Sequence, residues 1–148
     1  GKWDTSKFYG DFGLYAQTGD LAIINDKVDV AAYYAGFNLG YKFTTSFKIE
    51  LGFEYLSGKD QNDSDTKVKS FSPLFGTNHA FNGLMDYFYV GNHKNTVGLQ
   101  DVYSKFFFEK NKWQITLAPH LFYSSADIYN SDTLEIQENY WFIKEIKC

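Results

Sequence analysis

Hydrophobic and polar residues alternate strictly along several stretches of the chain. From Phe47 to Tyr55 every odd position is apolar, and the even positions hold Lys, Glu or Gly. The same phase runs from Ala31 to Phe43, and only Thr44 to Ser46 separate the two stretches. Because successive side chains of a strand point to opposite faces, this period of two predicts two antiparallel strands joined by a hairpin.

Further stretches show the same alternation. Phe8 to Gln17 predicts a strand upstream, and Asp101 to Glu109 predicts one downstream that turns at Lys110 to Lys112 into a strand over Trp113 to Ser124. Leu134 to Ile146 alternates poorly and is also assigned as a strand. The pattern therefore predicts an all-β fold, an antiparallel up-and-down meander, in a single domain covering residues 1–148.

The lengths of these strands and of their connections suggest a membrane barrel. The strands run for roughly 10 to 16 residues, longer than the usual 5 to 6 of globular strands, and a tilted membrane strand needs about 9 to 11. Long connections (Gln17 to Lys27, about residues 58–96, Ser124 to Thr133) alternate with the two short turns. In an up-and-down barrel the long connections then share one rim, so the fold is expected to form part of a transmembrane β-barrel.

The face opposite the apolar stripe is polar and would line the passage of such a barrel. Its candidate solute-binding residues are Lys42, Lys48, Glu50, Glu54, Asp101, Lys105 and His120. Periodicity alone does not distinguish this arrangement from a soluble lipocalin-like barrel, which turns its apolar face inward around a ligand. The aromatic residues Phe43, Phe47, Phe108 and Trp113 flank the short turns, where a membrane-interface girdle would lie, and favour the membrane barrel.

Composition narrows the class of protein. All 14 basic residues are lysine and the net charge is -4, which argues against a nucleic-acid partner. The single cysteine, Cys148, excludes an internal disulfide framework and a cysteine zinc site. No apolar run approaches the ~20 residues of a membrane helix, and mean hydropathy is -0.38. About six strands are fewer than the eight of the smallest single-chain membrane barrels, so we expect further strands outside this sequence.

The long connection carries two short motifs, and a third follows it at the start of the next strand; together the three resemble a known family. They are Leu74-Phe75-Gly76-Thr77-Asn78-His79, Gly83-Leu84-Met85-Asp86-Tyr87-Phe88 and Gly98-Leu99-Gln100-Asp101. They are similar to the Leu-Tyr-Pro-Thr-Asn/Gly-His, Gly-x-x-Asp-x-Phe and Gly-Leu-x-Asp segments of the alginate-export family of outer-membrane β-barrels, with Gly76 where the family often has Pro. The similarity covers roughly Ala35 to Ser125.

The resemblance implies a monomeric channel in the outer membrane of a Gram-negative bacterium. Outer-membrane lipid would surround it, and a hydrophilic solute or an anionic polysaccharide would diffuse through its lumen. Asn78, His79 and Asp86 of the long connection join the candidate solute-binding residues on this basis. Family pores that pass polyuronate are expected to be rich in Arg, which this chain lacks, so a general porin-like channel is favoured over a dedicated alginate exporter.

A catalytic function is the least supported hypothesis. His79 and Asp86 could serve an outer-membrane enzyme as a base and its orienting carboxylate, but their types and positions suit a loop that forms a plug or rim. His120 has no His or Cys partner at metal-ligand spacing, and no Gly-x-Ser-x-Gly nucleophile motif occurs. We therefore expect no enzyme activity, no metal and no cofactor.

Overall fold

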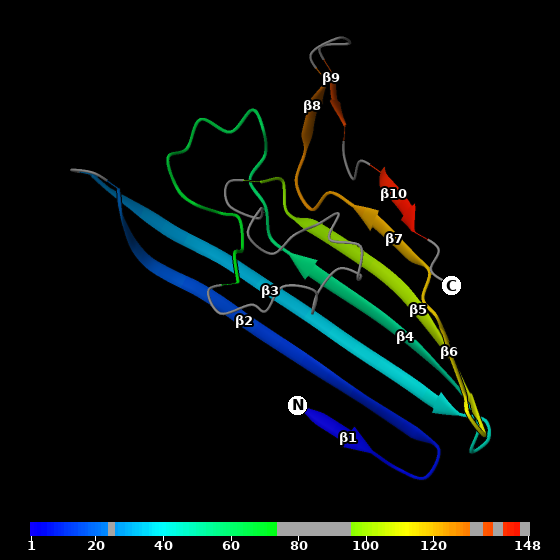
Figure 1. The fold of residues 1–148 in the computed structure, drawn as a ribbon. Helices are drawn as coiled ribbons and strands as arrows, with labels where there is room; N and C mark the ends of the chain where they lie inside the picture. Colours follow the sequence, from blue (N-terminus) through cyan, green and yellow to red (C-terminus); the bar gives the residue numbers. More distant parts are fainter. Residues whose placement is uncertain (24–25, 74–95, 131–134, 138–140, 146–148) are drawn as a thin grey trace.

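The computed structural model describes residues 1–23, 26–73, 96–130, 135–137 and 141–145. They form an all-β structure whose main sheet follows chain order, β1-β2-β3-β4-β5-β7-β10, with β6 also paired to β5 (Figure 1). The strands are β1 (Lys2–Asp4), β2 (Phe8–Ile23), β3 (Asp26–Lys42), β4 (Phe47–Leu56), β5 (Leu99–Lys110), β6 (Trp113–Leu117), β7 (His120–Tyr123) and β10 (Trp141–Glu145). A separate hairpin pairs β8 (Ile128–Asn130) with β9 (Glu135–Gln137). None of the described residues forms a helix long and apolar enough to cross a membrane.

All pairings between these strands are antiparallel, which confirms the predicted up-and-down meander. The sheet is not closed, since β1 and β10 stand at its two ends and the described residues do not pair them with each other. The described residues therefore form an open antiparallel sheet.

The predicted long connection from Gln17 to Lys27 is wrong. Strands β2 and β3 stay paired as far as Ile23 and Asp26, so they are 16 and 17 residues long. The apolar alternation stops near Ala16, but backbone hydrogen bonding does not depend on side-chain polarity and continues past it. The hairpin therefore extends beyond the apolar part of the sheet.

Two other strand predictions need correction. The strand expected over Trp113 to Ser124 is divided into β6 and β7 at Ala118 and Pro119, because proline has no N–H to donate to the ladder. The strand expected over Leu134 to Ile146 corresponds to β9 and β10, which belong to different sheets.

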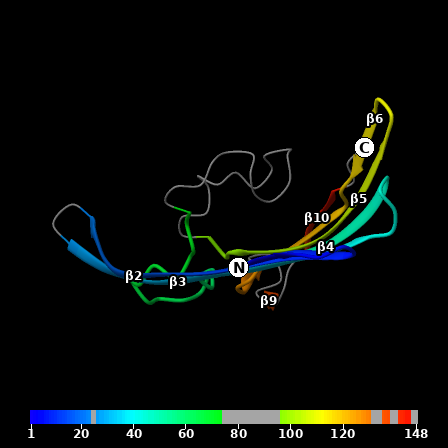
Figure 2. The same ribbon diagram turned by 90° about the horizontal axis from the view of Figure 1, so that it is seen from below.

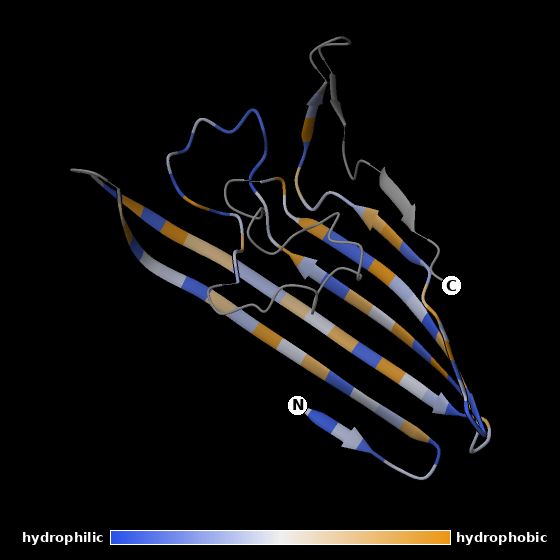
Figure 3. Cartoon of the chain, in the orientation of Figure 1, coloured by the Kyte–Doolittle hydropathy of each residue, from blue (hydrophilic) through white to orange (hydrophobic). Residues whose placement is uncertain are grey.

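The two faces of the sheet differ in polarity and in curvature. Along β2, β3, β4 and β5 hydrophobic and hydrophilic residues alternate (Figure 3), and the sheet bends across its strands (Figure 2). The segment around Phe71 rises on the concave side, and its ring lies 5.7 Å from that of Tyr34, which shares the phase of the charged positions. The charged face is therefore concave, and the apolar face is convex.

A small hydrophobic core lies on the concave face at the end of the strands away from the short turns. It consists of Ala32, Leu56, Phe71, Leu99 and Phe122. Gln17 holds the neighbouring Ser72 backbone with two hydrogen bonds, donated by Nε2 to the carbonyl (2.6 Å) and accepted by Oε1 from the amide (3.1 Å). The described start of the long connection thus folds inward over the sheet.

The convex face is largely uncovered. Leu14 is 73% exposed, Leu51 is 55% exposed and Trp113 is 72% exposed. Since burial of apolar surface is the main driving force of folding, a sheet that leaves this face bare needs an apolar medium or partner to cover it.

Candidate functional site

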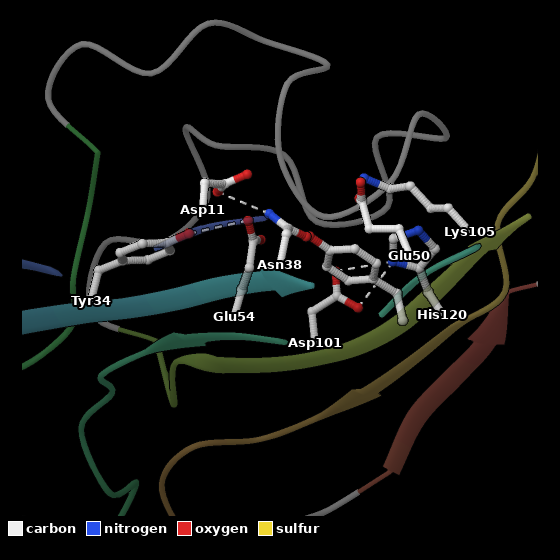
Figure 4. A network of polar contacts seen from close by, with 9 residues as sticks. Asp11, Tyr34, Asn38, Glu50, Glu54, Asp101, Lys105 and His120 are labelled. Carbon is white, nitrogen blue, oxygen red and sulfur yellow. Dashed lines mark hydrogen bonds and ion pairs between the residues drawn. The ribbon is translucent and has the colours of Figure 1, made fainter. Parts of the chain in front are cut away.

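A row of polar side chains crosses the concave face at one height. The strand register places Asp11, Asn38, Gly52, Tyr103 and His120 side by side on β2, β3, β4, β5 and β7. Figure 4 shows the side chains of Asp11, Asn38 and His120 on one side of the sheet. Residues far apart in the sequence therefore form one continuous polar belt.

Hydrogen bonds connect the first half of this belt. Asn38 Nδ2 donates to Asp11 Oδ1 at 3.1 Å, and the Tyr103 hydroxyl donates to Asn38 Oδ1. Tyr103 reaches from β5 to β3 because its ring lies flat over Gly52, where an added Cβ would overlap the ring. The missing side chain of Gly52 thus lets one tyrosine bridge three strands.

A buried acid and a histidine form the other half. Asp101 is completely buried and His120 is 5% exposed, and His120 Nδ1 lies 2.9 and 3.0 Å from the two carboxylate oxygens. The imidazole stacks between Tyr103 and Phe122, with ring centroids 4.9 and 5.6 Å away. A buried carboxylate is costly unless it is paired, so the histidine and its aromatic neighbours hold Asp101 in place.

Two further carboxylates lie beside the belt. Glu54 sits directly opposite Asp101 in the register and accepts a hydrogen bond from the Tyr34 hydroxyl at 3.1 Å, while its Oε2 is buried without a partner. Glu50 pairs with Lys105 at 3.2 Å, and the Lys105 ammonium lies 4.6 Å from the centre of the Tyr103 ring. This part of the face is hydrophilic and mainly acidic, so its charge would repel a polyanion.

The basic residues Lys42 and Lys48 lie nearer the short turns. Lys42 forms an ion pair with Asp4, and the Lys48 ammonium lies 5.1 Å from the centre of the Phe107 ring. A cavity bounded by both lysines opens beside the Thr44 to Ser46 turn. The concave face is thus acidic at mid-height and basic at the short-turn end.

The structure places seven of the ten candidate residues on one face. Lys42, Lys48, Glu50, Glu54, Asp101, Lys105 and His120 all lie on the concave side. Asn78, His79 and Asp86 lie outside the described residues. Within the described ranges, no group of three or more His, Cys, Asp or Glu side chains could hold a metal ion.

Four residues of the network are not among the candidates that the sequence indicates. They are Asp11, Tyr34, Asn38 and Tyr103. Each occupies the polar phase of its strand, which is the signal that could have identified it. The tyrosines are easily missed because they count as apolar in an alternation pattern although their hydroxyls bond within the polar network.

Comparison with known proteins finds no matching family model, no matching curated protein and no matching solved structure.

Proposed function

We propose that this chain forms part of an outer-membrane β-barrel channel that lets hydrophilic solutes pass passively. In this proposal the convex face contacts lipid and the concave face lines the lumen. The motif resemblance to the alginate-export family supports the outer membrane as the location. The acidic mid-height belt favours small hydrophilic solutes over a polyanionic chain.

The observation that carries the proposal is an exposed apolar band of limited height on the convex face. Along β4 it runs from Phe47 to Tyr55, eight residue steps or about 27 Å. A strand tilted by about 40° spans roughly 20 Å with this length, close to the ~25 Å band of membrane barrels. On the same face beyond the band, Asp20 and Asp29 stand opposite each other. The band therefore ends where the chain becomes charged.

Aromatic residues mark both edges of this band. Phe47 and Phe108 are register partners at the short-turn edge, where Trp113 is also exposed. At the other edge the rings of Tyr33 and Tyr55 stack with their centroids 5.5 Å apart. Aromatic rings at both edges match the aromatic girdles that flank the apolar band of membrane barrels.

Curvature favours this proposal over a soluble lipocalin-like barrel. A lipocalin-like barrel would close with its apolar side chains on the concave face. Here the charged network is on the concave side, so closure of the same curvature would enclose Glu54 and Asp101 in the lumen.

Glu50 and Leu51 are adjacent in the sequence but lie on opposite faces of the sheet, and this difference provides a test of the proposal. In a Cys148→Ser background, Glu50→Cys and Leu51→Cys differ by one residue and should face different media. After reconstitution of the full-length protein into lipid vesicles, a water-soluble maleimide should label Glu50→Cys and leave Leu51→Cys unmodified. Brominated lipid should quench the fluorescence of Trp113, and the protein should conduct ions in a planar bilayer.

Two outcomes would contradict the proposal. A full-length protein that remains in aqueous solution without detergent and does not float with vesicles would not be a membrane barrel. Equal labelling of Glu50→Cys and Leu51→Cys in vesicles would show that the convex face meets water.

A further inference from the structure

A cavity of about 250 Å³ lies at the short-turn end of the concave face. It is bounded by the turn Thr44–Ser46, by Lys42 and Lys48, and by side chains of the β5–β6 hairpin that include Phe107. The uncharged polar residues among the described ones that line it are Thr44, Thr45, Ser46, Gln114 and Thr116. These groups offer hydrogen-bond donors together with two positive charges.

The two lysines are direct cross-strand partners. Lys42 on β3 stands opposite Lys48 on β4, and like charges in this position repel each other. Lys42 is neutralised by its ion pair with Asp4, and its ammonium also donates to the Thr5 carbonyl at 3.1 Å. Lys48 contacts the Phe107 ring, and no carboxylate of the described residues forms an ion pair with it. Its charge is therefore available to a ligand.

We propose that this cavity binds a small oxyanion, the chemistry that phosphate and carboxylate groups share. Lys48 supplies the main charge, and the Gln114 amide and Thr116 hydroxyl lie around the same space as donors. The bound anion would screen Lys48 from Lys42. Lys7, Lys110 and Lys112 at the same end of the sheet add positive potential. The inference rests on the cavity and does not require that the protein is a channel.

Among the residues that the structure describes, Glu109 is the one acidic residue that lines this cavity. Its side chain is exposed, and its charge would repel an entering anion or compete for Lys48. Removal of the Lys48 charge should consequently weaken anion binding, and removal of the Glu109 charge should strengthen it.

Binding is measurable by NMR on the isotopically labelled, folded protein. Sodium phosphate and sodium acetate are titrated separately, with chloride used to keep the ionic strength constant. Saturable shifts should appear at Ser46, Gln114 and Thr116. Lys48→Gln should weaken binding by about tenfold, and Lys48→Arg should retain it. Glu109→Gln should tighten binding by about threefold.

Lys67→Gln is the matched control, because it removes the same charge at the far end of the sheet, where Lys67 faces Asp29 at 3.8 Å. Its affinity should equal that of the unmodified protein. Shifts that do not saturate with either anion, or that saturate with the same affinity in Lys48→Gln as in the unmodified protein, would overturn the inference and identify the effect as general screening. A protein that conducts ions but shows no saturable binding would contradict this inference and leave the proposed channel intact.

Discussion

At the scale of single residues, tyrosine rings occupy the space that glycines leave on the concave face. The Tyr103 ring lies over Gly52, and the Tyr9 ring lies over Gly40. In each case the tyrosine comes from the strand next to the glycine. The missing Cβ lets a large side chain lie flat against the sheet, so its hydroxyl can reach a partner farther away. The polar belt depends on this close approach.

We predict that Gly52→Ala destabilises the protein by about 1 to 3 kcal/mol, because the new methyl group overlaps the Tyr103 ring and breaks its bond to Asn38. Gly13→Ala is the control on the same face, since its Cβ would lie 3.2 Å from the Tyr15 ring and 3.7 Å from the Tyr34 ring, farther than a Cβ on Gly52 would lie from the Tyr103 ring. Denaturant unfolding of both variants measures the difference. In a Tyr103→Ala background the cost of Gly52→Ala should largely disappear; an unchanged cost would show that the ring is not the cause.

The sequence was sufficient to assign each side chain to a face of the sheet, but it was not sufficient to predict which side chains contact each other across strands. The period of two placed Lys48, Glu50 and Glu54 on one face because each strand alternates by itself. Predicting the contact of His120 with Asp101 also requires the register of β7 against β5. The break between β6 and β7 at Pro119 makes that register hard to infer from the sequence. Tyr103 is harder still, since its bond to Asn38 crosses an intervening strand.

At the scale of elements, strand ends were predicted less well than strand centres. The alternation ends near Ala16, whereas the β2–β3 ladder continues to Ile23. Alternation reports which medium covers each face, and it stops where both faces meet the same polar surroundings. Backbone pairing has no such limit. The mismatch therefore has a physical meaning, because it marks the height at which the apolar band ends.

The connection after β4 contains a half-buried charge cluster that should respond to acid. Lys69 Nζ lies 2.7 Å from Asp63 and 3.4 Å from Asp65. The hydrogen bond from Lys69, helped by the Asp65 amide, holds the pKa of Asp63 below its ordinary 3.8. The amide of Lys67 and then the Lys69 ammonium lower the pKa of Asp65.

A carboxylate with a lowered folded-state pKa stabilises the fold above its ordinary pKa, and this stabilisation is lost as pH falls through the lowered value. We predict that the Lys69 contacts persist at pH 5 and are lost only well below pH 3.8. NMR titration of the two aspartate carboxyl groups measures this directly. Lys69→Gln should return both pKa values toward 3.8, while Lys67→Gln should leave Asp63 little changed. Ordinary pKa values for both aspartates in the unmodified protein would contradict the predicted effect of the Lys69 contacts.

At the scale of the whole molecule, the two faces of the sheet differ sharply in chemistry. One face carries Leu14, Leu51 and other exposed apolar side chains, while the other holds a connected network of acids, amides and tyrosines. A soluble sheet normally reverses this distribution by packing its apolar face against a core. An apolar medium outside and water inside satisfy both faces without any rearrangement.

The depth of the apolar band leads to the last prediction. Leu51 lies at the middle of the band, and Thr18 lies on the same convex face past its edge. If lipid covers the band, Leu51→Lys should cost about 2 to 4 kcal/mol and Thr18→Lys at most about 1 kcal/mol. If water covers it, the 55% exposed Leu51 should tolerate lysine within about 0.5 kcal/mol, so both variants should behave alike. Unfolding by denaturant from lipid vesicles measures both variants. A large difference between the two costs requires hydrocarbon at the middle of the band. In water, the cost of a lysine at an exposed strand position does not depend strongly on its distance from the turn.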